Sequence, residues 1–490
     1  MLYSTPEKEG ISSANIQAFL QVLEDAQLPM HDVIICRHGK IVFEKYWAPF
    51  HKDYLHRMYS VTKSFVSLAI GFLEQDGLVD LDAPISRYFP EETRKTVDPN
   101  KRNQTVRHML MMSTARVNVN WFEGRADDRV QFYFERDLPQ SRPSGTIFNY
   151  DSSGSFVMGA LVERITGKDL MTYLREKLLD KIGFSQEAYM LKCPGGHSWS
   201  DSALICKPTD LLKAAQFCMN KGRWNGEQLL NEAYVTAATS KQIDNNLGGR
   251  NLCDTQGYGY QFWMTYDNSF FFYGMGSQLA VCIPDKDMIF VCNGDTQGYP
   301  QGPEVILGNF FRMVVRTASD AALEEAPEAQ AALQHYAEPL QLFAAKGAVF
   351  APLQEKINGV TFRMEENPMG ITSLRLCFRE NGGTLYYTNA TGDKTLSFGM
   401  CANAFGSFPE PGYSDMVGSQ PGDRLYRCAV SAAWVTEYQL FMKVQIIDTY
   451  FGNLNITFGF RDADRVGVYM EKTAEDFLNE YQGFADGRAE

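Results

Sequence analysis

The sequence predicts an α+β fold in which a large helix-and-sheet domain is joined to a smaller all-β domain. Three observations support this prediction: an apolar pattern of helical period over 61–75, a run of strand-like segments that closes the first half, and more such segments after it. A stretch rich in Ala and Glu, with two prolines, separates the halves. We therefore expect a domain over 1–316, a linker with helical content over 317–345 and a β-rich domain over 346–490.

The first domain is expected to build one antiparallel sheet from both ends of its chain. Residues 12–25 have the pattern of an amphipathic helix, and 32–47 that of a hairpin turning at His38 and Gly39. The middle, 100–240, is mostly helical in pattern. Four strands and a closing helix follow, at 258–266, 269–276, 278–284, 287–295 and 303–316. This order suits a sheet that is packed by helices and accompanied by a helical region.

The second domain consists of short strand-like segments separated by turn residues. Their alternating apolar residues predict a small antiparallel barrel or a sandwich. The segments are 359–365, 371–380, 383–391, 425–435, 438–448, 453–462 and 465–472.

Composition and charge exclude several classes of protein. The net charge of −13, with no long basic patch, argues against a nucleic-acid partner. The sequence contains no run of 18 or more apolar residues, so we expect no membrane span, and we find no secretory signal. Ten scattered cysteines without a Cys-x-x-Cys pair, and histidines without metal spacing, indicate free thiols, no metal and no cofactor. These observations lead us to expect a cytoplasmic protein whose partner is a small molecule or a short peptide, with no indication of its oligomeric state.

The stretch "MYSVTKSFVSLAIGFLEQDG" places Ser60 and Lys63 at the mouth of the helix 61–75. Residues three apart share one helix face, so the lysine amine can reach the serine hydroxyl. Serine needs such a base to become a nucleophile, and lysine can serve if its surroundings lower its pKa from about 10.4. The spacing is a weak signal alone, because a serine that caps a helix beside an exposed lysine gives the same pattern.

The wider stretch from "RHGKIVFEKYW" to "YGMGSQLAVCIPDKDMIFVCNGD" resembles the serine β-lactamase-related hydrolases over residues 10–316. This family includes class C β-lactamases, D-alanyl-D-alanine carboxypeptidases, esterases and 6-aminohexanoate-dimer hydrolases. The resemblance implies a β-lactamase/transpeptidase-like domain, in which an antiparallel sheet with helices and an all-helical subdomain enclose the catalytic cleft. It also makes Ser60 the nucleophile and Lys63 part of its proton network.

The second motif of the family, Tyr-x-Asn, matches Tyr150-Asp151-Ser152 in "FNYDSSG". The resemblance makes Tyr150 the phenol that exchanges protons with Ser60 and Lys63. Ser152 stands where the family has asparagine and could still bind substrate, with a shorter reach. Asp151 either tunes the site or caps the following helix, and we expect it to be the cap.

The third motif is matched by "FYGMGSQ" at 272–278, whose glycines let a strand approach a substrate closely. The resemblance places the cleft strand at Gly274, Met275 and Gly276, and we expect the backbone N–H of Met275 to join that of Ser60 in an oxyanion hole. Tyr273 and Gln278 are candidate substrate contacts.

Two further candidates lie in loops that the family uses to line its cleft. His197 in "GGHSWSDS" and Trp121 are possible substrate contacts, although Ser113-Thr114-Ala115-Arg116 replaces the usual Thr-Ser-Gly-Leu before Trp121. The C-terminal domain resembles the lipocalin-like barrels appended to some of these hydrolases. Such a barrel could wall the cleft, aid assembly or bind part of a substrate.

The sequence thus leads to two hypotheses about function. The first is a serine hydrolase that forms an acyl-enzyme from an ester or amide through Ser60, Lys63 and Tyr150, without being an efficient β-lactamase. The second is an inactive, penicillin-binding-like sensor for a peptide or peptidoglycan fragment. The third motif carries no cation to bind a substrate carboxylate, which favours neutral or cationic substrates over β-lactams. Esterase, amidase and peptidase activities are not distinguished.

Overall fold

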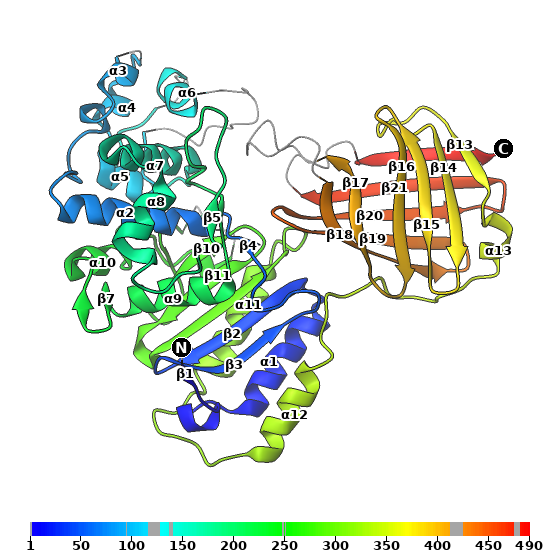
Figure 1. Cartoon of the computed structure of the whole chain (residues 1–490), viewed down its shortest axis with the longest axis horizontal. Helices are drawn as coiled ribbons and strands as arrows, with labels where there is room; N and C mark the ends of the chain where they lie inside the picture. The colour runs from blue at the N-terminus through cyan, green and yellow to red at the C-terminus, as the bar shows by residue number, and fades with distance from the viewer. Residues whose placement is uncertain are drawn as a thin grey trace. The chain divides into compact units, whose positions relative to one another are not determined.

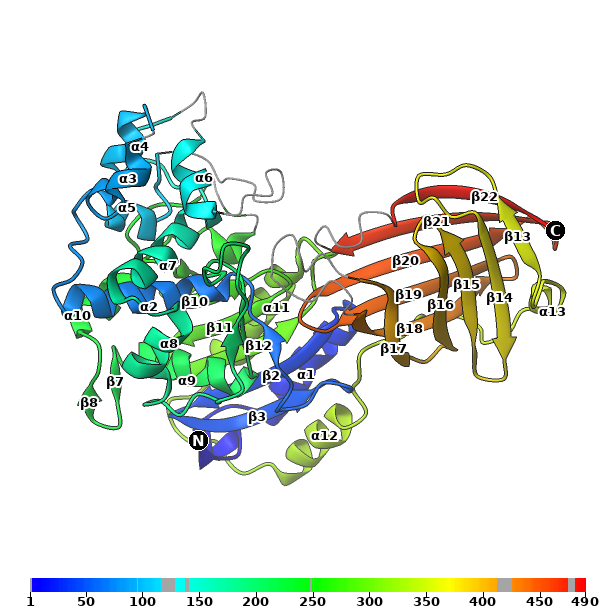
Figure 2. The ribbon, with the colours of Figure 1, turned by 45° about the horizontal axis from the view of Figure 1, so that its top comes forward.

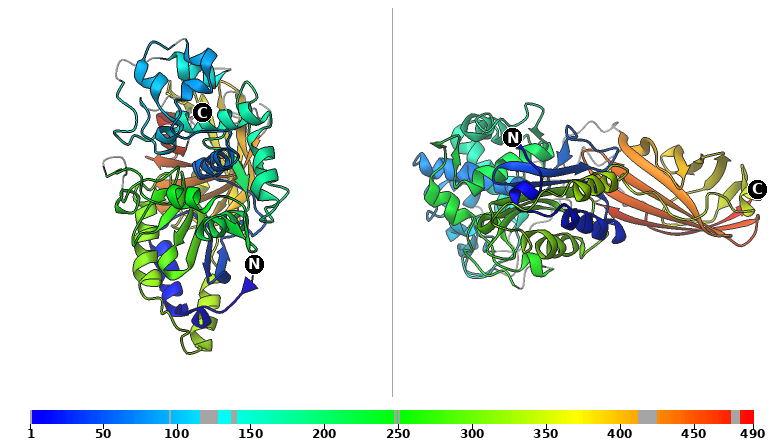
Figure 3. Two further views of the ribbon diagram at one scale, coloured as in Figure 1. Left: turned by 90° about the vertical axis from the view of Figure 1, so that its left-hand side faces the viewer. Right: turned by 90° about the horizontal axis from the view of Figure 1, so that it is seen from below.

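The computed structural model describes residues 2–94, 96–115, 128–136, 141–246, 249, 251–411, 425–474 and 481–490. The chain divides into two compact units, the first ending at Gln341 and the second beginning at Leu342. The range 317–345 contributes a helix, α12 (Pro327–Ala337), to the first unit, where it lies alongside α1 (Ser13–Asp25) (Figure 3). The domain boundaries expected from sequence stay a prediction.

Both ends of the first unit contribute strands to one sheet (Figure 1). Within the described residues its order is β1-β3-β2-β12-β11-β10-β9, with all pairings antiparallel except that of β1 with β3. The strands are β1 (Leu2–Tyr3), β2 (Met30–Arg37), β3 (Lys40–Tyr46), β9 (Trp263–Met264), β10 (Phe270–Gly274), β11 (Gln278–Ile283) and β12 (Met288–Gly294). Figure 2 shows β2 and β3, from the start of the chain, beside β12 from the end of the unit.

Helices pack on both faces of this sheet, because its apolar residues point to both sides. On one face Phe290 of β12 lies between Phe19 of α1 and Phe310 of α11 (Gly302–Phe310), at centroid distances of 5.8 and 4.1 Å. On the other face Phe272 of β10 packs against Phe65 of α2 (Val61–Gln75), with ring centroids 6.1 Å apart. This burial holds the N-terminus of α2 against the sheet.

The middle of the chain forms most of the remaining helices, as expected. They are α3 (Pro90–Thr93), α4 (Pro99–Asn103), α5 (Val106–Leu110), α6 (Arg129–Glu135), α7 (Ser152–Thr166), α8 (Leu170–Leu174), α9 (Pro208–Met219) and α10 (Glu232–Ala238). Short pairings join β4 (His56–Arg57), β5 (Tyr189–Met190) and β6 (Leu204–Cys206), and separately β7 (Arg223–Trp224) and β8 (Glu227–Gln228). In the part of the chain described, no helix combines the length and apolar character needed to cross a membrane.

One expected strand is much shorter than its sequence suggests. The apolar stretch 258–266 predicts a continuous strand, but only β9 (Trp263–Met264) pairs with β10. Gln261 has a left-handed backbone (φ 62°), which breaks the extended conformation just before Trp263. The prediction of a full strand here is wrong.

The second unit is a β-barrel, which confirms the expected fold class. Its described strands run in the order β16-β15-β14-β13-β22-β21-β20-β19-β18-β17, and a pairing of β16 with β18 closes the ring. A short helix, α13 (Leu353–Ile357), precedes the strands. The strands are β13 (Thr361–Met364), β14 (Ser373–Arg379), β15 (Gly382–Asn389), β16 (Gly392–Met400), β17 (Ala404–Pro411), β18 (Leu425–Thr436), β19 (Gln439–Ile447), β20 (Phe451–Phe460), β21 (Arg465–Ala474) and β22 (Gly483–Ala489).

Candidate active site

Ser60 lies at the N-terminus of α2, directly after a residue with a left-handed backbone. Tyr59 has φ 46°, whereas Ser60 has helical angles and occupies the position before the first residue of the helix. The turn at Tyr59 brings the chain from β4 into the helix, and Ser60 lines a cavity at this point. Its hydroxyl oxygen accepts a hydrogen bond of 2.8 Å from Nζ of Lys63.

Lys63 lies one helical turn further on and is 2% exposed. Besides Ser60, its Nζ donates to the backbone carbonyl of Asp201 at 2.6 Å. The same Nζ lies 5.1 Å from the centroid of the Tyr150 ring. The spacing of Ser60 and Lys63 therefore produces the expected contact, and a carbonyl that is distant in sequence fixes the direction of the amine.

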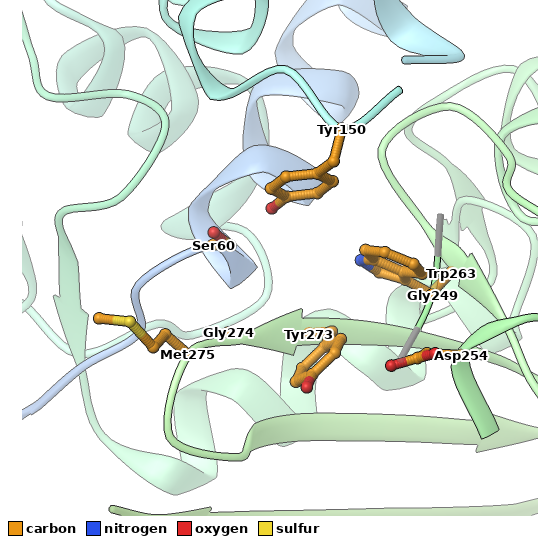
Figure 4. A pocket seen from close by; sticks show the side chains of 8 residues that line it. All are labelled: Ser60, Tyr150, Gly249, Asp254, Trp263, Tyr273, Gly274 and Met275. Atoms are coloured by element: carbon orange, nitrogen blue, oxygen red, sulfur yellow. The ribbon is translucent and has the colours of Figure 1, made fainter. Parts of the chain in front are cut away.

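Tyr150 lies across the cavity from Ser60, with its hydroxyl end directed toward the serine (Figure 4). The helix α7 starts just after it, and Asp151 caps that helix by accepting from the N–H of Gly154 at 3.0 Å. The bond from Gly154 confirms the expectation that Asp151 is a helix cap, and Thr114 also donates to the Asp151 carboxylate, at 2.8 Å. The Tyr150 ring stacks on Trp263 with centroids 5.5 Å apart.

The third motif forms the turn between β10 and β11. Gly274 ends β10, and a Cβ built on it would lie 2.2 Å from the carbonyl oxygen of Met58, so only glycine lets the strand come this close to the start of α2. Gln278 is buried and holds the turn by donating from Nε2 to the carbonyls of Met275 at 3.1 Å and Gly294 at 2.7 Å. The strand therefore lies close to the start of α2, and its expected approach to a substrate stays a prediction.

These elements surround a cavity of about 330 Å³. Three aromatic rings form part of its wall: Trp263 stacks on Tyr150 and meets Tyr273 edge-on, with centroids 5.7 Å apart. Asp254 adds a carboxylate that also accepts from the N–H of Asn251 at 3.0 Å. The lining residues are Ser60, Tyr150, Gly249, Asp254, Trp263, Tyr273, Gly274 and Met275 (Figure 4).

Three of these lining residues were missed by the sequence analysis: Gly249, Asp254 and Trp263. Trp263 could have been proposed, since it falls in an aromatic strand-like segment next to the third motif. Asp254 and Gly249 lie in a loop that no motif marks. Nearby, Tyr258 is fully buried. Burial is the main cause that raises the pKa of its hydroxyl, and the charge of Tyr150 raises it further, so Tyr258 stays neutral.

Several candidate residues lie elsewhere. Ser152, the first residue of α7, and Gly276 do not line the cavity among the residues described, and Gln278 acts within the turn. His197 pairs with Glu163 at 2.6 Å, and this hydrogen bond raises the pKa of the imidazole. Trp121 and Arg116 lie outside the described residues. No group of three or more His, Cys, Asp or Glu side chains is placed to hold a metal ion in the described ranges.

Comparisons with known proteins agree with this architecture. A family model described as Beta-lactamase matches residues 14–298, more than half of the chain, and the chain therefore belongs to the beta-lactamase family. This finding confirms the resemblance drawn from the motifs.

Two curated relatives match parts of the chain. A 6-aminohexanoate-dimer hydrolase from Paenarthrobacter ureafaciens is 22% identical over 249 residues, which cover 47% of this chain and 63% of the relative. Esterase EstB from Burkholderia gladioli is 30% identical over 177 residues, which cover 31% of this chain and 45% of the relative. The chain thus spans less than two thirds of the length of either relative.

Solved structures show the same fold at low identity. The octameric penicillin-binding protein homologue from Pyrococcus abyssi is similar with a TM-score of 0.51 and 15% identity, over 96% of this chain and 99% of that one. EstCE1, a hydrolase with promiscuous acyltransferase activity, is similar with a TM-score of 0.50 and 14% identity, over 61% of this chain and 98% of that one.

Proposed function

We propose that this chain is a serine hydrolase that cleaves esters or amides through an acyl-enzyme on Ser60. The observation that carries the proposal is the 2.8 Å hydrogen bond between Nζ of Lys63 and Oγ of Ser60 at the wall of a cavity that Tyr150 also lines. A nucleophile within reach of a base, with a second proton carrier beside them, meets the geometric requirement for nucleophilic catalysis.

The proposed reaction has two halves. In the first, the Ser60 hydroxyl loses its proton to Lys63, Oγ bonds to the substrate carbonyl carbon, and the bond to the leaving alcohol or amine breaks as Tyr150 gives that group a proton. In the second, water gives a proton to the Tyr150 phenolate as its oxygen bonds to the acyl carbon, and the bond from that carbon to Oγ breaks as Lys63 returns its proton to Oγ. The acid is released, and Ser60, Lys63 and Tyr150 end in the protonation states in which they began.

Two backbone groups could stabilise the negative oxygen of the intermediate. Within the described residues, the N–H groups of Ser60 and Met275 have no hydrogen-bond partner, and both residues line the cavity. The N-terminus of α2 adds its partial positive charge at Ser60. A single donor of this kind typically lowers the barrier by about 2.7–4 kcal/mol.

The cavity wall supports a preference for neutral or cationic substrates. Its described lining residues include a carboxylate, Asp254, and three aromatic rings, but no lysine, arginine or histidine. A substrate carboxylate placed there would lack a charge-assisted hydrogen bond worth about 1.5–3 kcal/mol. We therefore propose that p-nitrophenyl butyrate or an amide with a free amine is cleaved with higher kcat/KM than nitrocefin. Faster hydrolysis of nitrocefin would contradict this preference.

Covalent labelling tests the proposal. A fluorophosphonate should add one adduct, which mass spectrometry places on the peptide that contains Ser60. Ser60→Ala should abolish the adduct, whereas Ser67→Ala, a change of a buried serine on the same helix that does not line the cavity, should keep it. A folded wild-type protein that stays unlabelled would favour the alternative, an inactive binding protein for a peptide or peptidoglycan fragment.

A further inference from the structure

A buried glutamine two residues before Trp263 is hydrogen-bonded to three helices of the first unit. Gln261 is 2% exposed, and both its backbone and its side-chain polar atoms have partners. Its backbone N–H donates to the carbonyl of Leu110 on α5 at 3.0 Å. Its backbone carbonyl accepts from Oγ of Ser64 on α2 at 2.7 Å. The backbone of this one residue therefore connects α2 with α5.

The side-chain amide of Gln261 adds a connection to α7. Its Nε2 donates to the carbonyls of Met109 at 3.1 Å and Leu110 at 2.9 Å, and its Oε1 accepts from Oγ of Ser155 at 2.7 Å. The left-handed backbone of Gln261 costs free energy, and such a conformation persists where the surrounding structure enforces it. The hydrogen bonds to three helices supply that enforcement.

The helices that Gln261 joins carry two of the groups proposed to react. On α2, Ser64 directly follows Lys63. On α7, Ser155 also donates to the carbonyl of Asp151 at 3.3 Å, and Asp151 directly follows Tyr150. The partners of the glutamine are thus close in the chain to both proton carriers.

On its other side, Gln261 leads into the aromatic wall of the cavity. Trp263 stacks on Tyr150 with centroids 5.5 Å apart, and Tyr258 meets the indole edge-on at 5.1 Å (Figure 4). Two residues of chain extend by at most about 7 Å, so a displacement of Gln261 is passed on to Trp263. The glutamine therefore ties the indole to the helices that carry Lys63 and Tyr150.

We propose that Gln261 is a positioning residue that fixes the indole of Trp263 against Tyr150 and at a constant distance from Ser60. A substrate group that rests on this aromatic wall is then held with its carbonyl at the nucleophile. Misplacing reacting atoms by about 1 Å can cost about 10²-fold in rate, so such a support affects catalysis without touching the substrate. This inference rests on the proposed hydrolase function of the cavity.

Gln261→Met separates positioning from folding. Methionine has nearly the same length without polar atoms, so the change removes the side-chain hydrogen bonds and keeps those of the backbone. Every group that loses the amide keeps another partner, so no buried polar group is left unpaired and we expect the variant to fold. These remaining pairs are Oγ of Ser155 with the carbonyl of Asp151 at 3.3 Å, the carbonyl of Leu110 with the backbone N–H of residue 261 at 3.0 Å, and the carbonyl of Met109 with the N–H of Met112 at 3.2 Å.

A double-mutant cycle with Trp263→Leu in the full chain tests the proposal, with kcat/KM for p-nitrophenyl butyrate as the readout. Gln261→Met alone should lower kcat/KM by about tenfold, a size that coupled neighbours commonly show. In the Trp263→Leu background the same change should lower it by less than about twofold, because no indole remains to be positioned. A role in folding alone would give equal losses in both backgrounds.

A matched control is Gln104→Met, which removes the amide of another fully buried glutamine of the first unit. That amide donates to the hydroxyl of Tyr133 at 2.9 Å and accepts from the N–H of Ala115 at 3.2 Å, and neither partner lines the cavity. Whatever its size, the effect of Gln104→Met on kcat/KM should be the same with and without Trp263→Leu.

If Gln261→Met does not fold, Ser155→Ala carries the test, because it removes the donor to Oε1 of Gln261. Its loss of kcat/KM should be smaller than tenfold and should also vanish in the Trp263→Leu background. Equal losses in both backgrounds overturn the inference and leave the proposed function standing. A folded wild-type protein that neither cleaves the ester nor reacts with a fluorophosphonate would instead contradict the proposed function itself.

Discussion

The two units of the chain differ in how many non-glycine residues have a left-handed backbone. Among the described residues of the first unit there are eleven, and one of them, Tyr59, directly precedes the cavity residue Ser60. In the barrel, among its described residues, Cys401 alone has such a backbone. Strained positions of this kind cost free energy and persist where the surrounding structure enforces them, typically at functional sites.

The units also balance buried charge differently. In the barrel, the carboxylate of Glu410 accepts from Lys394 at 3.1 Å, Tyr481 at 3.0 Å and Asn389 at 2.7 Å. Behind the cavity of the first unit, Lys63, Arg57 and Arg129 are buried around the turn at residues 199–202, where Lys63 and Arg57 donate to backbone carbonyls rather than to a carboxylate. We propose from this contrast that the charges of the barrel cluster serve the fold and that the charges behind the cavity serve the proposed reaction.

The largest effect that tests this contrast is expected at the proton network. Lys63→Ala and Tyr150→Phe should each lower kcat/KM for an activated ester by at least about 10²-fold, because each removes a proton carrier. The double variant should be little worse than either single variant, since residues that act as a unit are not additive. Lys394→Ala, which breaks the balanced barrel cluster, should lower the free energy of unfolding and leave kcat/KM nearly unchanged. A comparable loss of kcat/KM in Lys394→Ala would break the contrast.

A smaller effect on kcat/KM is expected when a glycine beside the cavity is replaced. Gly274→Ala places a methyl group 2.2 Å from the carbonyl of Met58, so β10 must move away from the start of α2. Displacing a group at the reacting centre by about 1 Å can cost about 10²-fold in rate, and we expect a loss of kcat/KM approaching that size. Gly406→Ala on β17 of the barrel meets nothing within 4 Å and serves as the control. Equal kcat/KM for both variants would show that the close approach of β10 has no catalytic role.

Much of the fold could be predicted from local patterns. The helix 61–75 was predicted with its observed bounds, because its apolar spacing is strong and Asp76-Gly77 ends it. Three barrel strands, β16, β17 and β22, were not predicted. β22 contains two glycines and an aspartate, and β17 contains two prolines, so neither has strand-like composition. They become strands because distant partners pair with them, such as β13 and β21 with β22.

The same distinction applies to the site. Ser60 and Lys63 are neighbours on one helix, so their contact follows from spacing alone. Tyr150 needed the family resemblance, because only the fold brings it across the cavity. Asp201 and Asp254 belong to loops without a motif, and their places depend on long-range packing that a pattern of residues does not encode. Sequence therefore indicated the groups proposed to react and the turn residues Tyr273, Gly274 and Met275, but missed the lining residues Gly249, Asp254 and Trp263.

The smallest expected effect concerns a balanced cluster in the first unit, at Glu9. Its buried carboxylate accepts from Ser4 and Lys40 at 2.7 Å each and pairs with His38 at 2.8 Å. Burial raises the pKa of Glu9, but these partners outweigh it and lower the pKa from 4.5 to about 2. A carboxylate with a lowered pKa stabilises the folded state above its unfolded value, and this stability is lost as the pH falls from about 4.5 to about 2.

Glu9→Gln should therefore lower the free energy of unfolding by about 1–2 kcal/mol at pH 7, and by progressively less as the pH approaches the folded pKa. Urea unfolding at several pH values measures this difference. The exposed pair of Glu325 with Lys8 offers the control, since Glu325→Gln should change stability by less than about 1 kcal/mol at any pH. A penalty for Glu9→Gln that does not change with pH would mean that Glu9 acts through packing rather than charge. That result would contradict the proposal that balanced buried charges, such as those around Glu9, stabilise the fold through their ion pairs.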